Sequence, residues 1–361
     1  MKVRSLWKRA AIGAGALMAV TLLSGATYER VMRYRAWRSI DMPGRRILVE
    51  TGRYLQLDCR GKGSPTVVLE SGLDPYGPLA WSSVHDSLAR TTRTCAYSRP
   101  GIMWSDPAKG PFDARALAQD LHSALINAGE SAPWILVGHS IGGAFITMFT
   151  HMHQSEVAGL VYVDPSHPDQ FARFQEVTGK SIVPSPTLVQ VGSLLAWTGL
   201  VRLLPSEPSP AQWPRQIDAV APAFLPTSVD ELRREVEGIP SILHSVDTLR
   251  ALGDRPVVVL TATVGPSTEA IRTMGITPTQ AAQLALVSQR LHADMASWSS
   301  RGEHEVVGGA SHYIQFDRPD VVIRSVGRMV TSVRARSSAA QRPPAAIAST
   351  LTPVSAHASP M

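Results

Sequence analysis

The fold is decided by the stretch Trp134-Ile135-Leu136-Val137-Gly138-His139-Ser140-Ile141-Gly142-Gly143, in which a run of strand-type residues meets Gly-x-Ser-x-Gly and the start of an apolar helix. Gly-x-Ser-x-Gly alone is a weak pattern, but a strand before it and a helix after it predict a sharp elbow that carries the serine. Glycines two positions away on each side let strand and helix approach closely because they have no Cβ. The sequence therefore predicts Ser140 as a nucleophile at the carboxyl edge of a buried sheet.

A serine hydroxyl is a weak nucleophile at neutral pH, so this prediction requires a general base. We predict His312, which lies on a glycine-rich loop after a strand-like segment and before a helical C-terminal stretch. The chain order serine, acid, histidine, with the histidine on the last loop, is typical of this elbow arrangement. His139 is expected to point away from the pocket. His151 and His153 are two residues apart on a helix and face different ways, which disfavours a metal pair.

A tetrahedral oxyanion requires two backbone N–H groups aimed at one point. The elbow itself supplies the amide of Ile141. Residues 65–70 read as a fully buried strand that ends in Ser71-Gly72-Leu73, so the amide of Leu73 is the second candidate. The alternative for this second stretch is an ordinary strand-to-loop turn that contains a glycine.

These residues resemble the α/β-hydrolase superfamily, specifically its esterase-like, cap-bearing branch with a membrane-proximal N-terminus. Residues 96–106 resemble the loop after strand four, and residues 161–165 resemble strand six and its exit. The resemblance covers about residues 45 to 335. It implies an α/β fold with a mostly parallel, doubly wound, eight-stranded sheet and a helical cap inserted between strands six and seven. It implies no metal and no organic cofactor.

The sequence departs from the commonest pattern of the superfamily at the acid. Many members carry the triad aspartate after strand seven, but residues 257–266 contain no carboxylate, and the first acid beyond them is Glu269. A known variation places the acid after strand six, where Asp164 stands, so we favour Asp164 over Glu269. Asp before Pro also opens turns. In that case the acid is Glu269, or the triad is incomplete.

The resemblance implies a carboxylic ester hydrolase that acts on a moderately apolar ester or lactone through an acyl-enzyme on Ser140, with Asp164 orienting His312. Amidase, thioesterase, carbon–carbon bond hydrolase and cofactor-free haloperoxidase activities stay open, because the same three residues serve them all. Epoxide and haloalkane hydrolysis are disfavoured because relatives with those activities use an aspartate nucleophile. An alternative of another class is a non-catalytic, membrane-tethered binding protein on a hydrolase scaffold.

The chain of 361 residues fits one α/β domain that carries an insertion. The expected parts are a signal peptide or membrane anchor with its linker, a first core part, a helical cap, a second core part and a disordered tail, at residues 1–44, 45–164, 165–255, 256–336 and 337–361. In the cap, prolines are expected to separate helix-length segments. Candidate residues for lining an acyl or alcohol pocket are Trp197, Leu200, Trp213 and Phe224.

The positive charge of the chain belongs to its N-terminal part. The formal net charge is +6, but residues 1–46 carry ten Lys or Arg against two Asp or Glu, so the remainder has 25 basic against 27 acidic residues. A nucleic-acid partner therefore has little support. Four basic residues precede an apolar stretch at residues 10–26, the layout of an export signal or an anchor. We favour a retained anchor with the hydrolase outside the cytoplasm; a buried core helix is the alternative.

Two cysteines are present, Cys59 and Cys95, each in a strand-like segment. The resemblance makes these segments strands two and four, which are neighbours. A disulfide and a pair of buried thiols both fit this arrangement. A disulfide would agree with a location outside the cytoplasm.

Overall fold

An eight-stranded sheet forms the centre of the computed structural model, which describes residues 2–110, 112–183, 186–203 and 209–340. The strands are β1 (Arg45–Glu50), β2 (Arg53–Arg60), β3 (Thr66–Glu70), β4 (Thr94–Tyr97), β5 (Trp134–His139), β6 (Val157–Val163), β7 (Gly253–Ala262) and β8 (Ser299–Val307). They lie side by side in the order β1-β2-β4-β3-β5-β6-β7-β8. The pairs β1–β2 and β2–β4 are antiparallel, and every other neighbouring pair is parallel. This is the predicted mostly parallel sheet.

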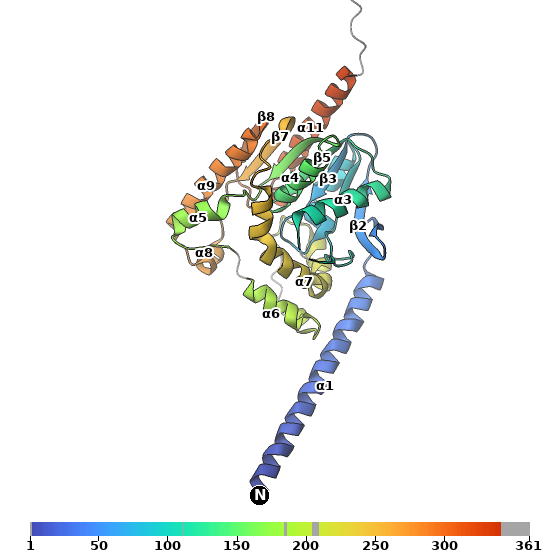
Figure 1. Cartoon of the computed structure of the whole chain (residues 1–361), viewed down its shortest axis with the longest axis vertical. Helices are drawn as coiled ribbons and strands as arrows, with labels where there is room; N and C mark the ends of the chain where they lie inside the picture. The colour runs from blue at the N-terminus through green and yellow to red at the C-terminus, as the bar shows by residue number, and fades with distance from the viewer. Residues whose placement is uncertain (1, 111, 184–185, 204–208, 341–361) are drawn as a thin grey trace, which may run out of the picture.

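Helices cover both faces of the sheet (Figure 1). The helices are α1 (Lys2–Ser39), α2 (His85–Ala89), α3 (Ala114–Ala128), α4 (Gly142–Met152), α5 (Gln170–Thr178), α6 (Thr187–Ala196), α7 (Arg215–Val246), α8 (Thr268–Met274), α9 (Pro278–Ser297), α10 (Ile314–Asp317) and α11 (Pro319–Ala340), with short 3-10 turns η1 (Gly77–Trp81) and η2 (Leu200–Leu203). The strand β5 is buried throughout because both of its faces are covered. Its side chains alternate, so Trp134 and Leu136 pack with α3 and α4, whereas Ile135 and Val137 pack with α2 and α11.

The helix predicted at residues 113–128 is present as α3. Asp113 caps it, because its side chain accepts a hydrogen bond from the N–H of Arg115. Gly129 ends it in the left-handed region, at φ 82°, where a residue with a Cβ would be strained. The local sequence therefore fixes both ends of this helix.

The segment between β6 and β7 holds α5, α6, η2 and α7. The prediction that prolines separate its helices is wrong for α7, a continuous helix of 32 residues that contains Pro222, Pro226 and Pro240. A proline in a helix removes one backbone hydrogen bond. Most helix stability in proteins comes from packing, and α7 buries Phe224 and Ile239 on the face it turns to the domain.

The N-terminal apolar stretch belongs to α1, which runs on through the arginine-rich segment to Ser39. The part Trp7–Ser39 is long enough to cross a membrane and contains an 18-residue window with a mean hydropathy of 1.6, none of which is buried in the protein. Figure 1 shows the N-terminal half of α1 projecting away from the domain. The alternative of a buried core helix is therefore excluded.

The C-terminal helix α11 extends to Ala340. Residues 337–340, which the composition assigned to a disordered tail, are therefore helical, and the hydroxyl of Ser337 donates to the carbonyl of Val333 one turn earlier. The rest of the predicted tail, residues 341–361, lies outside the described residues. In the antiparallel part of the sheet, Cys59 of β2 lies opposite Cys95 of β4, and the two form a disulfide.

Candidate active site

Ser140 lies at the sharp turn between β5 and α4, with φ at 54°. Residues with a Cβ rarely adopt this left-handed region, so the surrounding structure must hold it there. The N–H of Ser140 donates to the carbonyl of Val163 at 3.1 Å, and its own carbonyl accepts from the N–H of Ser166 at 2.9 Å. A Cβ at Gly142 would lie 2.5 Å from the carbonyl oxygen of Ser71, which explains the glycine at that position.

The structure brings Ser140, His312 and Asp164 together in one hydrogen-bonded row. The Nε2 of His312 lies 2.9 Å from the Oγ of Ser140, and its Nδ1 lies 2.7 Å from Oδ2 of Asp164. The other oxygen, Oδ1, accepts from the N–H of Ala262 at 2.8 Å. Burial acts to raise the pKa of Asp164, but the hydrogen bond and charge of His312 outweigh it, so this pKa lies below its ordinary value. An ionised Asp164 accepts Nδ1–H, which leaves Nε2 to accept the serine proton.

Glu269, the alternative acid, does not contact His312. It lies in the first turn of α8, is exposed, and pairs with Arg272 in the same helix. The carboxylate that contacts His312 comes from the exit of β6, next to β5 in the sheet.

Leu73 and Ile141, the candidates for the oxyanion hole, line the same cavity as Ser140. Within the described residues, neither backbone N–H donates a hydrogen bond to another part of the chain. The loop that carries Leu73 lies very close to the elbow, because a Cβ on Gly72 would be 3.1 Å from the Cβ of Ser140. Two unpaired amides beside the serine are the donors that a developing oxyanion requires.

His139 does not line the cavity; instead, its side chain hydrogen-bonds to the loop that carries His312. Its Nε2 donates to the backbone carbonyl of His312 at 2.9 Å, and the two rings lie 4.7 Å apart. Burial, and next the charge of His312, lower the pKa of His139 to about 3. His139 is therefore neutral at physiological pH and adds no second charge beside His312.

A second hydrogen-bonded row, formed by His292, Thr261 and His304, lies next to Asp164. The sequence analysis did not predict it. The Nε2 of His292 donates to the carbonyl of Pro165 at 2.8 Å, so its Nδ1 accepts from the hydroxyl of Thr261, also at 2.8 Å. That hydroxyl in turn accepts from Nε2 of His304 at 2.8 Å. Burial lowers the pKa of His292, and its Nδ1 lies 3.9 Å from Asp164. Because His292 is neutral, it forms no ion pair with Asp164, and the negative charge of Asp164 remains available to stabilise a protonated His312.

A buried arginine, Arg99, holds the loop that carries Leu73. The sequence analysis did not predict this role. The guanidinium of Arg99 donates to the carbonyls of Ser71 and Gly72 at 2.8 and 2.6 Å. It also pairs with Glu70 of β3 and with Glu235 of α7, each at 2.8 Å. All three charged side chains are buried. Arg99 therefore ties the loop beside Ser140 both to the sheet and to the helix above it.

Asp74, next to this network, provides a pH-dependent prediction. Burial raises its pKa to about 7, and its Oδ2 has no partner among the described residues. The folded protein thus binds a proton that the unfolded chain releases near pH 4, so Asp74 makes unfolding easier as the pH rises from about 4 to 7, by up to about 1.4 kcal/mol per pH unit. We expect Asp74→Asn to raise the melting temperature at pH 8 and to change it little at pH 4. Equal shifts at both pH values would contradict this assignment.

Ser140 and His312 open into a cavity of about 500 Å³. Its lining is mainly apolar, and residues from α5, α7, α8 and α9 contribute to it. The apolar side chains are Leu73, Ile141, Pro165, Phe171, Phe174, Ile182, Ile239, Met274 and Leu291. The roof therefore comes both from the segment between β6 and β7 and from α8 and α9 after β7, which the sequence analysis assigned to the second core part.

The prediction for the residues that line this cavity is wrong, because none of the four candidates, Trp197, Leu200, Trp213 and Phe224, reaches it. Trp213 packs against Tyr313, with ring centroids 4.6 Å apart, and Phe224 packs against Trp104 at 4.3 Å. The remaining two candidates, Trp197 and Leu200, lie on the outer surface. Apolar residues at helical spacing are predicted to be buried, but the spacing does not indicate which residues they pack against.

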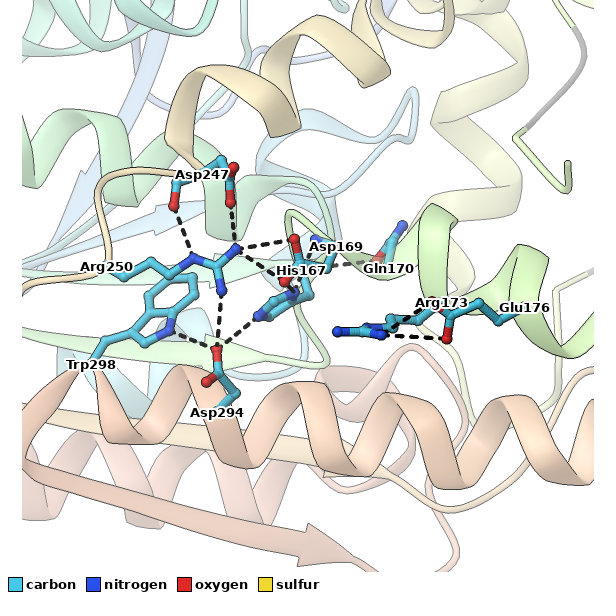
Figure 2. A network of polar contacts seen from close by, with 9 residues as sticks. All are labelled: His167, Asp169, Gln170, Arg173, Glu176, Asp247, Arg250, Asp294 and Trp298. Carbon is cyan, nitrogen blue, oxygen red and sulfur yellow. Dashed lines mark hydrogen bonds and ion pairs between the residues drawn. The ribbon is translucent and has the colours of Figure 1, made fainter.

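A polar network fixes the wall of the cavity around His167 (Figure 2). The Nε2 of His167 donates to Asp294 of α9 at 3.1 Å, and its Nδ1 accepts from the N–H of Asp169 at 3.0 Å. Arg250, in the loop after α7, pairs with Asp169 at 3.0 Å and also with Asp247. Burial lowers the pKa of His167, so the ring is neutral. The network joins the start of α5, the loop after α7 and helix α9.

Among the described residues, two groups of side chains of the types that bind metals lie close together. One contains the disulfide-bonded Cys59 and Cys95, and the other consists of His122, His153 and Glu156. His122 already contacts Glu156 at 3.0 Å. The two imidazole rings are stacked 3.8 Å apart and nearly parallel, so their nitrogens do not converge on one point. This geometry does not match a tetrahedral metal site.

Comparisons with known proteins agree with this architecture. The model of the Alpha/beta hydrolase family matches residues 63–325. An esterase from Thermogutta terrifontis superposes with a TM-score of 0.56 at 19% identity, covering 80% of this chain and 98% of that one. The epoxide hydrolase CorEH superposes with a TM-score of 0.55 at 18% identity, covering 80% and 98%. At these identities the likeness concerns the fold.

An uncharacterized protein of Schizosaccharomyces pombe is 40% identical over 83 residues, which are 23% of this chain and 16% of that protein. The chain thus matches about a sixth of the length of this curated relative. The family match, in contrast, spans most of the chain and includes both Ser140 and His312. This chain belongs to the alpha/beta hydrolase family.

Proposed function

We propose that the chain is a serine hydrolase that cleaves a carboxylic ester or lactone, with Ser140 as nucleophile, His312 as general base and Asp164 as orienting acid. The observation that carries the proposal is the continuous row from Asp164 through His312 to Ser140, with contacts of 2.7 and 2.9 Å, at the edge of an apolar cavity. A serine at the elbow does not fit the alkyl-ester route of epoxide hydrolysis, which uses a carboxylate nucleophile.

In the proposed reaction, His312 takes the proton of Ser140 as the hydroxyl attacks the ester carbonyl. The amides of Leu73 and Ile141 stabilise the negative oxygen of the tetrahedral intermediate. His312 then gives its proton to the leaving alcohol, and an acyl-enzyme remains on Ser140. Water, deprotonated by the same imidazole, releases the acid and restores the serine. Asp164 stabilises the charged imidazole in both steps.

The cavity supports a moderately apolar substrate. Beyond the reacting groups, nine of its lining residues are apolar, including Phe171 and Phe174 of α5, and the polar ones are Ser166, His167, Gln170, Ser288 and His292. A volume of about 500 Å³ accommodates a small molecule and not a polypeptide. The Thermogutta terrifontis protein that shares this fold is an esterase, which is consistent with this proposal.

We further propose that α1 anchors the chain in a membrane and that the hydrolase lies outside the cytoplasm. The long, apolar and unburied part of α1 supports the anchor. The disulfide between Cys59 and Cys95 supports the compartment, because disulfides persist in oxidising surroundings.

An active-site-directed fluorophosphonate tests the proposed nucleophile. We expect the full chain to be labelled, since the phosphonate mimics the tetrahedral intermediate at an activated serine. Labelling is expected to disappear in Ser140→Ala and to persist in Ser311→Ala, because the hydroxyl of Ser311, although next to His312 in the chain, donates to Asp317. Absence of labelling in the native chain would favour a binding protein on a hydrolase scaffold.

A series of p-nitrophenyl esters of increasing acyl length then tests the proposed substrate class. We expect kcat/KM to rise from acetate to medium-length acyl groups, since each added methylene buries more apolar surface in the cavity. Ile239→Asn, on the α7 side of the cavity, is expected to reduce this preference while acetate hydrolysis changes less. A profile that is flat with chain length would contradict an acyl-binding role for the cavity.

A further inference from the structure

A group of large apolar side chains is exposed on α6 and on the turn that follows it. We call it the α6–η2 surface, and its members are Val191, Leu194, Leu195, Trp197, Leu200 and Leu203. Leu194 and Leu203 are 71% and 70% exposed, and Trp197 is 50% exposed. On soluble proteins, exposed apolar side chains usually occur singly, whereas a contiguous group of them indicates a surface that binds an apolar partner.

The α6–η2 surface lies directly against α1, at the point where the apolar stretch of α1 ends. A Cβ on Gly25 would be 2.3 Å from the carbonyl oxygen of Thr198, and a Cβ on Gly199 would be 2.9 Å from the ring of Tyr28. The backbones of α1 and of the turn before η2 therefore touch. On the other side of this contact, toward its N-terminus, α1 also exposes large apolar side chains, among them Leu17 and Leu23.

A buried ion pair between α1 and η2 fixes the position of the α6–η2 surface along the axis of α1. Glu29 of α1 binds Arg202 of η2 through two hydrogen bonds, at 2.6 and 3.0 Å, and both side chains are largely removed from solvent. Arg202 also donates to the carbonyl of Ala223 in α7, at 3.0 Å. The turn is thus tied both to the anchor and to the helix that covers the domain.

We propose that the α6–η2 surface inserts into the same leaflet from which α1 emerges, so that the domain lies against the membrane through two contacts. The inference rests on the proposed anchor. If the apolar stretch at residues 10–26 of α1 crosses the hydrocarbon, its 17 residues at 1.5 Å per residue span about 26 Å, close to the hydrocarbon thickness. Gly25 then lies next to the hydrocarbon boundary, and the side chains packed beside it are at the same depth.

The residues around this boundary have the composition of a membrane interface. Trp197 and Tyr28 are aromatic and part-exposed, a type that concentrates at headgroup level. A groove beside Trp197 is lined by Arg30 and Arg33 of α1, whose positive charges suit the phosphates of anionic lipids. Lipid is therefore the occupant that fits both the apolar residues and the basic edge.

Depth-dependent quenching tests the proposal on the full chain. Both native cysteines are paired, so one introduced cysteine can be labelled selectively with the fluorophore NBD. The variants are Leu194→Cys and Leu203→Cys on the α6–η2 surface, and Ile126→Cys on α3 and Leu286→Cys on α9 as controls that are 51% and 56% exposed. Leu17→Cys reports on the anchor. Each is reconstituted in phosphatidylcholine–phosphatidylglycerol vesicles with lipid carrying a doxyl quencher at acyl carbon 5, and Leu17→Cys, near the middle of the span, is also tested with the quencher at carbon 12.

We expect loss of fluorescence at positions 194 and 203 and no loss at the two controls. Quenching at position 17 together with full fluorescence at 194 and 203 overturns the proposal and leaves the anchor intact. Full fluorescence at 17 as well overturns the anchor and the proposal together. Energy transfer between labelled copies at position 194, without lipid quenching, overturns it in favour of a second copy of the chain.

Discussion

Asp164→Asn is expected to lower the turnover of an ester substrate by about 10⁴-fold, because an amide cannot hold His312 in the tautomer whose Nε2 accepts the serine proton. Asp164 is the carboxylate 2.7 Å from Nδ1 of His312. The variant should still fold, since the amide oxygen of asparagine can continue to accept from the N–H of Ala262. Steady-state hydrolysis of a p-nitrophenyl ester measures the effect.

Glu269→Gln is the matched control, because it neutralises the alternative acid on α8. We expect its turnover to remain close to that of the native chain, since Glu269 is exposed and pairs only with Arg272 among the described residues. Near-normal activity in Asp164→Asn, with a large loss in Glu269→Gln, would transfer the orienting role to Glu269. Similar losses in both variants would argue against a single orienting acid.

Arg99→Met is expected to reduce the free energy of unfolding by about 3–5 kcal/mol, the usual consequence of removing one partner from a buried ion pair. The change leaves Glu70 and Glu235 buried without a cation, and it releases the carbonyls of Ser71 and Gly72. Denaturant titration of the full chain measures it. Because the loop with Leu73 loses its support, kcat is expected to fall as well.

Two further variants make this prediction specific. Arg272→Ala removes an exposed arginine that pairs with a carboxylate, and its cost should stay below about 1 kcal/mol. Arg99→Met combined with Glu70→Gln and Glu235→Gln should recover part of the lost stability, because no buried charge is left unpaired. A single Arg99 variant as stable as Arg272→Ala would show that the network contributes little.

The pattern around Ser140 predicted the sheet and the elbow, because strand, turn and helix signals there are local and strong. Residues without a Cβ were required at Gly138 and Gly142, and the approach of Ser71 to Gly142 shows the close contact that requires them. The position of His312 followed from chain order. The acid could be narrowed only to Asp164 or Glu269, since no local signal says which loop end reaches the imidazole.

The lining of the cavity could not be predicted from the chain. Trp213 and Phe224 show the apolar spacing of buried residues, but their neighbours, Tyr313 and Trp104, come from distant parts of the sequence. The same limit applies to Arg99, whose two carboxylate partners lie on β3 and α7. Burial and charge pairing depend on which elements meet, and this is a property of the folded chain.

The sequence by itself determined the elements and the chemistry that each can offer: an elbow serine, a late histidine, a basic apolar leader and a parallel sheet. It did so because hydrophobic period, glycine placement and charge runs act over a few residues. The tertiary structure decided which carboxylate meets His312, which helices roof the cavity, and that α1 packs against η2 through Glu29 and Arg202. These outcomes join residues more than a hundred positions apart, where only packing sets the distance.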